Sequence, residues 1–176
     1  MQPASARDMQ PAISLLEKTP RLLETMVCDL PGELLHWKPA PERWAISEVL
    51  AHLAALEQVY AERALRMVAE ESPALLKYDL SGAETRGEYL RGSAGEHLAL
   101  FTRTRRSTLA LLAGLPASAG ARTGLHSELG SFTLTEMLNE WANHDLGHIR
   151  QIAELYRAHA FHPRSGPFIK YSNPQP

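Results

Sequence analysis

The chain has 176 residues, 44% hydrophobic and 22% charged, which are the proportions of a single globular domain. Its 18 Lys and Arg against 20 Asp and Glu give a net charge of −2, which excludes a protein that holds nucleic acid through an overall excess of cations. The single cysteine, Cys28, excludes an intrachain disulfide framework and a multi-cysteine zinc site. Because there are eight histidines, a transition metal would have to be bound by imidazole and carboxylate groups.

The sequence carries no segment typical of secretion or of membrane insertion. Residues 1–10 lack the apolar core of a signal peptide. The longest weakly polar run, 109–121, contains Gly114, Pro116 and Gly120, and it is shorter than the roughly 20 residues of a membrane-spanning helix. We therefore expect a cytoplasmic protein that binds neither nucleic acid nor a membrane.

The first apolar stripe at helical spacing extends from Ile13 to Leu30. Pro20 lies inside this stripe, where it would remove a backbone donor from a helix interior. Thr19 suits the N-cap position, with the proline then at the first helical position. We therefore predict the main helix over 20–30.

Three further helices follow from the same periodicity. They are predicted over 46–71, 94–115 and 134–159, the last beginning after a capping box of Thr133 and Glu136. The connections at 34–44, 73–93 and 116–124 are predicted to be irregular, and no segment has the alternation of a strand. Four amphipathic helices indicate an all-α four-helix bundle. Its domain would cover residues 1–160, followed by an extended C-terminal tail at 161–176.

Two histidines stand out on the last helix. His144 and His148 are four residues apart, so they differ by only about 40° around the helix axis and can chelate one ion. Trp141 and Ile152 lie on the same side of the helix. Both histidines therefore face the apolar stripe and the core.

A third histidine faces inward from the second long helix. His52 shares its side with Val49 and Leu56. Three inward imidazoles fit a three-ligand metal site with open positions for water or substrate, and burial would keep them neutral, as a ligand must be. A lone inward histidine is, however, more often a hydrogen-bonded core residue, and spacing does not show that His52 meets the other two.

Three carboxylates are candidates for catalytic or ligand-orienting roles. Glu48 and Glu140 lie one turn before His52 and His144, so each could orient an imidazole or reach the metal. A solvated charge is the favoured interpretation of both. Asp145 lies at the edge of the inward arc and is either a partner of a ligand imidazole or a buried acid.

The other polar motifs are weaker candidates for a functional role. Arg103, Arg105 and Arg106 form a basic cluster, typical of a solvated face; Arg103 and Arg106 would bind an anionic substrate or thiol cofactor if the cluster lined the metal cleft. Cys28 is predicted to be a small core residue. Residues 144–148 resemble HExxH with aspartate for glutamate, which is one methylene too short for the usual general base of a peptidase.

Five histidines, namely His36, His97, His126, His159 and His162, lie in predicted loops, on other faces or near the tail, with His126 the least certain of them.

Two stretches of the chain resemble the DinB/YfiT-like superfamily of metal-dependent enzymes. Residues 35–39 and 44–53 look like the family's loop and second helix, which end on its first histidine. Residues 133–138 and 141–152 look like its fourth helix, with HxxxH followed by Gln-Ile. One departure is Ala45, where the family usually has a capping Ser or Thr; the lost cap would cost about 1 kcal/mol. Residues 73–125 carry no family motif.

The resemblance implies a four-helix bundle with long crossover connections and a divalent metal ion, Zn²⁺, Ni²⁺ or similar, held by His52, His144 and His148. It also implies a homodimer acting on a small-molecule substrate. Activities in the family include S-transfer and isomerisation with the thiols bacillithiol or mycothiol, and hydrolysis. A low-molecular-weight thiol is therefore a second expected cofactor.

The leading hypothesis is a metal-dependent enzyme, either a thiol-cofactor S-transferase or a small-molecule hydrolase. The alternative is a non-catalytic metal-binding or stress-associated helical protein, with a sealed pocket or no open coordination position. A third hypothesis is a metal-free helical interaction module, whose histidines would lie apart.

Overall fold

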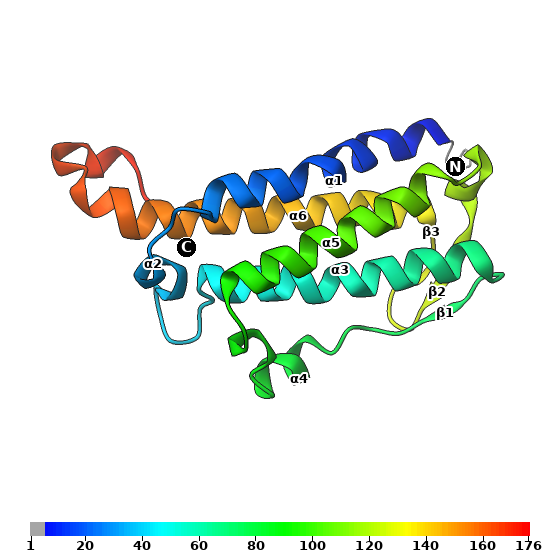
Figure 1. Ribbon diagram of the computed structural model, residues 1–176, viewed down its shortest axis with the longest axis horizontal. Coiled ribbons are helices and arrows are strands. Elements are labelled where there is room, and N and C mark those ends of the chain that lie inside the picture. The colour runs from blue at the N-terminus through cyan, green and yellow to red at the C-terminus, as the bar shows by residue number, and fades with distance from the viewer. Residues whose placement is uncertain (1–5) are drawn as a thin grey trace.

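A computed structural model describes residues 6–176 and places four long helices lengthwise beside one another (Figure 1). These helices are α1 (Ala6–Val27), α3 (Ile46–Ala69), α5 (Ala94–Ala113) and α6 (Leu134–Tyr156). Helices α3 and α5 run in the same direction, so the chain returns along the bundle between them. The predicted four-helix bundle with a long crossover connection is confirmed. Within residues 6–176, none of the helices combines the length and the hydrophobicity of a membrane-spanning segment.

Helix α1 is longer than predicted because its two internal prolines do not end it. The nitrogen of Pro20 cannot donate to the carbonyl of Leu16, four residues earlier. That carbonyl instead accepts a hydrogen bond from the Arg105 guanidinium of α5, at 2.9 Å. Thr19 is not an N-cap: its hydroxyl donates to the carbonyl of Leu15. The prediction of a helix confined to 20–30 was therefore wrong.

The other three long helices lie close to their predicted ranges, and their caps account for where they begin. Thr133 and Glu136 form the predicted capping box of α6, and Ser93 and Glu96 form another at the start of α5. Ala45 has no side chain that caps α3. Half of the box is nevertheless present in α3, because the Glu48 carboxylate accepts the Ala45 N–H at 2.8 Å.

The predicted irregular connections contain short elements that periodicity does not reveal. Helix α2 (Gly32–His36) lies in the first connection and α4 (Leu80–Thr85) in the second. In a small sheet, β1 (Ala74–Leu75) pairs parallel with β2 (Thr123–His126), and β2 pairs antiparallel with β3 (Gly130–Thr133). Strands of two to four residues are too short to show an alternating pattern, so the sequence predicted none of them.

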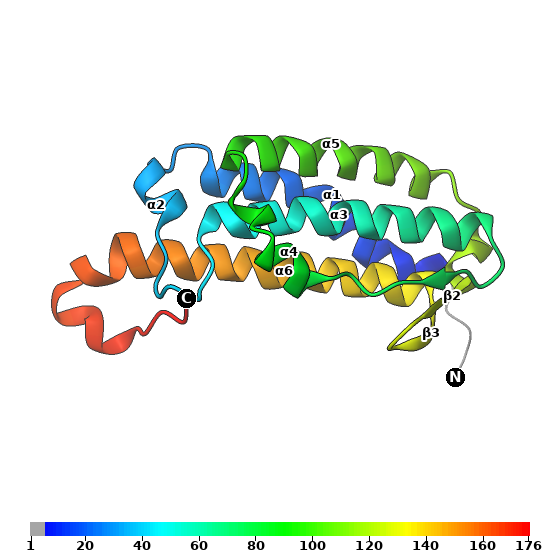
Figure 2. The same cartoon turned by 90° about the horizontal axis from the view of Figure 1, so that it is seen from below.

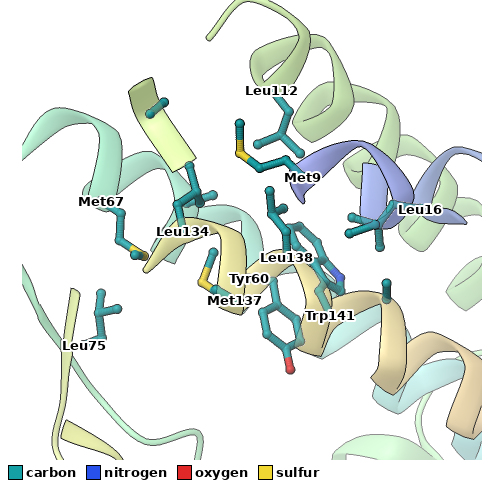
Figure 3. Close-up of a cluster of buried hydrophobic side chains, with 14 of the residues drawn as sticks. Met9, Leu16, Tyr60, Met67, Leu75, Leu112, Leu134, Met137, Leu138 and Trp141 are labelled. Carbon is teal, nitrogen blue, oxygen red and sulfur yellow. The ribbon is translucent and has the colours of Figure 1, made fainter. Parts of the chain in front are cut away.

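The apolar core fills the interior of the bundle in two main clusters. One lies toward the end closed by the sheet and combines residues of α1, α3, α5 and α6 (Figure 3). Its centre includes Leu16, Leu138 and Trp141, which are almost completely buried. The other lies toward α2 and includes Leu50, Leu53 and other apolar residues of the same four helices.

The tail is not extended as predicted. Residues 157–161 form a π-helical turn, and 162–164 and 166–171 form 3₁₀ turns before the last residues become extended. Proline is accepted in the first turn of a helix, and Pro163 and Pro167 occupy such positions. The tail folds back toward the loop between α2 and α3 (Figure 2).

Candidate metal centre

Helices α3 and α6 bring the three predicted histidines together. His52 lies in the second turn of α3, and His144 and His148 lie on successive turns of α6. One nitrogen from each imidazole lies within 4.8 Å of the others, and the Nε2 atoms of His52 and His144 are 3.1 Å apart. The structure therefore places His52 beside the other two, which spacing alone left open. This arrangement contradicts the hypothesis of a metal-free interaction module, which predicts that the three histidines lie apart.

Hydrogen bonds on the far side of two rings fix how those rings are turned. The Nδ1 of His148 lies 2.9 Å from the Gln151 side-chain oxygen, which can only accept, so Nδ1 carries the proton and Nε2 keeps its lone pair. The Nδ1 of His52 lies 3.1 Å from the hydroxyl of Tyr89. Neutral imidazoles that each offer one nitrogen to a common point, two of them anchored at Nδ1, are a donor set that a borderline divalent ion such as Zn²⁺ prefers.

Aromatic rings close one side of the cluster. The Trp44 ring lies 4.8 Å from the His52 ring and nearly parallel to the His148 ring, at 6.2 Å. Its indole N–H donates to Glu84 at 2.9 Å, which holds the ring in place. Trp44 thus separates the histidines from solvent on this side.

Burial keeps the three histidines neutral. It lowers the pKa of His52 to about 3 and that of His144 to about 4, and it also lowers the pKa of His148. Repulsion from neighbouring imidazoles lowers the pKa of His52 and His144 further. Each imidazole is therefore uncharged at neutral pH and keeps one nitrogen without a proton, as metal binding requires.

None of the three candidate carboxylates belongs to the histidine cluster. Glu48 is buried, accepts the Ala45 N–H and pairs with Lys38 at 2.8 Å, so its interpretation as a solvated charge was wrong and its role is to begin α3. Glu140 is exposed, as favoured, and accepts a hydrogen bond from Asn143. Asp145 was predicted to be either a partner of a ligand imidazole or a buried acid, and it is the buried acid.

Asp145 pairs with Arg105, which is fully buried at the centre of the bundle. Arg105 also binds Glu57 of α3, through contacts of 2.7 to 3.0 Å. Arg105 is therefore not part of a solvated basic face. The two charges that flank it in the sequence, Arg103 and Arg106, are exposed.

A cleft of about 730 Å³ opens beside His144 and His148. Its remaining walls come mainly from α6 and from the end of the tail, where the Gln175 N–H donates to Glu154 at 2.8 Å and Arg43 donates to the Pro176 carbonyl. The tail is thus one wall of the cleft.

Arg103 and Arg106 do not line this cleft. They border a separate groove between α1 and α5, together with Glu17, Arg21 and Glu24, which shares no residue with the histidine cleft. The condition under which they would bind an anionic substrate or thiol at the metal is therefore not met.

Cys28 and His126 lie outside the histidine cluster. Cys28 is exposed, and the prediction of a core residue was wrong; a hydrogen bond to Asp29 raises the pKa of its thiol. His126 is buried at the end of β2, where its Nδ1 accepts from the backbone N–H groups of Glu128 and Leu129.

Residues 15–152 match the DinB superfamily. The chain belongs to the DinB superfamily. It is 27% identical, over 81% of its length and 83% of the relative's, to an Oceanobacillus iheyensis protein named a "putative metal-dependent hydrolase". Its fold is similar to that of YfiT from Bacillus subtilis, described as a probable metal-dependent hydrolase with an unusual four-helix bundle topology. The TM-score is 0.81 and the identity 24%, covering 90% of this chain and 91% of YfiT.

Two residues that contact the histidine cluster were not predicted from the sequence. Tyr89, which contacts His52, lies in the connection where no periodicity or motif signals a role. Gln151 belongs to the stretch that resembles the family, but only the structure shows its bond to His148. A signal for Gln151 existed in its spacing, because residues three apart on a helix are neighbours.

Proposed function

We propose that this protein is a metal-dependent enzyme that holds one divalent ion, Zn²⁺ or Ni²⁺, through the Nε2 atoms of His52, His144 and His148. The observation that carries the proposal is the convergence of one nitrogen from each of three neutral imidazoles to within 4.8 Å of one another. Within residues 6–176 no carboxylate belongs to this cluster, so a divalent cation is the partner that best fits the three nitrogens. The names of the similar proteins also support a metal-dependent activity.

The site suits catalysis better than storage of an ion. Three protein ligands leave coordination positions free, and the cleft beside His144 and His148 has room for a small molecule. A bound ion would supply Lewis acidity, which polarises a substrate oxygen or acidifies a water or thiol. Trp44 packs against His52 and His148. The open cleft beside His144 and His148 disfavours the alternative of a sealed, non-catalytic metal site.

Within this class we propose hydrolysis of a small molecule. The similar proteins are named for hydrolysis, whereas the arginine pair expected to attract an anionic thiol lies on another face. In the histidine cleft Arg43 and Arg150 are balanced by Glu140 and Glu154, so its formal charge gives no preference for an anion. Thiol-dependent transfer is the second outcome that the assay below distinguishes.

The experiment combines metal stoichiometry with activity. Purified protein is stripped with a chelator, reloaded with Zn²⁺ or Ni²⁺, desalted and analysed by elemental mass spectrometry, beside His148→Ala and the control His97→Ala. We expect one equivalent in the wild type and the control, and a clear loss in His148→Ala. Equal metal content in all three proteins, or no retained metal in the wild type, would overturn the proposed site.

The loaded protein is then assayed on a panel of small esters, amides and lactams, with and without bacillithiol or mycothiol. We expect hydrolysis that requires the metal and no thiol. Turnover only in the presence of a thiol would replace hydrolysis by S-transfer while leaving the metal site intact.

A further inference from the structure

Two tyrosines connect a proposed metal ligand to the surface of the long crossover connection. The hydroxyl of Tyr89 lies 3.1 Å from Nδ1 of His52 and 3.0 Å from the hydroxyl of Tyr78. Tyr89 is 6% exposed, whereas Tyr78 is half-buried and lines a surface groove beside α4. The three groups form one hydrogen-bonded row from the histidine cluster to the groove.

The local structure holds Tyr89 firmly against α3. Gly87 precedes the short turn of Tyr89 with a φ of 63°, a conformation that residues with a side chain rarely adopt. Tyr89 packs with Ala51 and Ala83, and its ring meets Trp44 edge-on at 5.4 Å. This packing fixes the hydroxyl opposite Nδ1 of His52.

The direction of the hydrogen bonds in this row decides which nitrogen of His52 is available. If Tyr89 donates its proton to Tyr78, its oxygen accepts the Nδ1 proton of His52, and Nε2 keeps its lone pair. If Tyr89 donates to Nδ1 instead, the proton of neutral His52 lies on Nε2, which then cannot bind a cation. A hydroxyl has one proton, so the first arrangement requires Tyr78 to accept it, which the 3.0 Å contact between the two hydroxyls allows.

We propose that Tyr89 and Tyr78 are positioning residues that hold His52 in the tautomer whose Nε2 lone pair faces His144 and His148. Tyr89 does so by accepting from Nδ1, and Tyr78 does so by accepting the Tyr89 proton. The inference rests on the proposed metal site. It gives the crossover connection, which carries no motif, a role in metal binding.

The test compares wild type with Tyr89→Phe, Tyr78→Phe and the double variant. Tyr60→Phe is the matched control, because Tyr60 is buried, its ring lies 5.9 Å from that of His144, and its hydroxyl makes no hydrogen bond within the described residues. Zinc affinity is measured by competition with a chromophoric chelator. Independently, long-range ¹H–¹⁵N spectra of the metal-free proteins at neutral pH report which nitrogen of His52 carries the proton.

We expect Tyr89→Phe to weaken zinc binding by about 10- to 100-fold, the usual effect of losing a partner of a ligand histidine. Tyr78→Phe, which touches no histidine, should weaken it by about 2- to 10-fold, the worth of one hydrogen bond. The double variant should match Tyr89→Phe, because Tyr78 acts only through Tyr89. In Tyr78→Phe the His52 proton should move from Nδ1 toward Nε2, whereas Tyr60→Phe should resemble wild type.

An unchanged His52 tautomer and unchanged zinc affinity in Tyr78→Phe would overturn the role of Tyr78, and the same result in Tyr89→Phe would overturn the proposal. Additive losses in the double variant would also contradict it, since they indicate two independent structural effects. Circular dichroism establishes that each variant is folded; if Tyr89→Phe is not, the partly exposed Tyr78→Phe decides the proposal. A wild type that binds no zinc would instead refute the proposed function.

Discussion

Replacement of the buried Arg105 by methionine tests how the four helices are held in register. Arg105 uses all five of its N–H groups: Nε and Nη2 donate to Glu57, Nη1 and Nη2 donate to Asp145, and Nη1 also donates to the carbonyl of Leu16. It thereby joins α5 to α3, α6 and α1 at once. Methionine keeps much of the volume of arginine and removes every one of these bonds.

The expected loss follows from what remains behind. Glu57 and Asp145 would stay buried without a counter-charge, and breaking a buried pair in this way costs about 3–5 kcal/mol. The Leu16 carbonyl would add about 1 kcal/mol, because Pro20 cannot supply a donor to it. A total near 5 kcal/mol corresponds to a melting temperature about 10–20 °C lower for a chain of this size.

The assay is urea unfolding at neutral pH together with a thermal melt, for wild type, Arg105→Met and the control Arg106→Met. Arg106 is the exposed neighbour on the same helix, and its replacement should change stability by less than about 0.5 kcal/mol. Arg105→Lys should fall between, because one ammonium cannot serve both carboxylates and the carbonyl.

Acid distinguishes this explanation from a simple packing defect. In Arg105→Met, the folded-state pKa of Glu57 should lie above the unfolded value, since burial opposes its charge and Arg105 no longer lowers its pKa. The destabilising effect of the Glu57 charge is then full above the folded pKa and disappears as pH falls below the unfolded one. A deficit under about 1 kcal/mol at neutral pH, or one that does not shrink toward about pH 4, would refute the reasoning.

The metal-free protein should lose about 2 kcal/mol of stability for each of His52 and His144 when the pH falls from about 7 to about 5. Burial places the folded pKa values of both histidines below the unfolded value of 6.5, so the unfolded chain takes up more protons over this range. Equal urea midpoints at both pH values would contradict this prediction. Gly87→Ala should lower the free energy of unfolding by about 1 kcal/mol and weaken zinc binding, because the positive φ of Gly87 sets the turn that carries Tyr89. A lower melting temperature with unchanged zinc affinity would show that this turn does not position Tyr89. Removal of residues 172–176 should leave the melting temperature nearly unchanged but speed the extraction of zinc by a chelator, because the tail is one wall of the cleft. An unchanged extraction rate would argue against a role of the tail in covering the site.

Local periodicity explains which parts of the site could be predicted. His144 and His148 share a face because a helix repeats every 3.6 residues, and their apolar neighbours place that face inward. The capping box of Thr133 and Glu136 likewise depends only on residues three apart. These features are local, and the structure has them where the sequence predicted them.

The misplaced features depend on partners far along the chain. Pro20 does not end α1 because Arg105, 89 residues beyond Leu16, satisfies the carbonyl that the proline leaves free. Arg105 itself lies in a run of basic residues, yet its position on α5 points it to two carboxylates on other helices. The prediction that Cys28 is buried was wrong for the same reason, because an apolar stripe on a helix does not show which of its ends other segments leave exposed to solvent.

The sequence by itself determined four amphipathic helices and an inward-facing pair of histidines on the last of them, because helical period and caps are properties of neighbouring residues. Only the tertiary structure decided that His52 joins this pair, that Tyr89 stands behind it and that the tail borders the cleft. These contacts arise where α3, α6, the crossover connection and the tail meet, and residues from segments so far apart carry no common spacing.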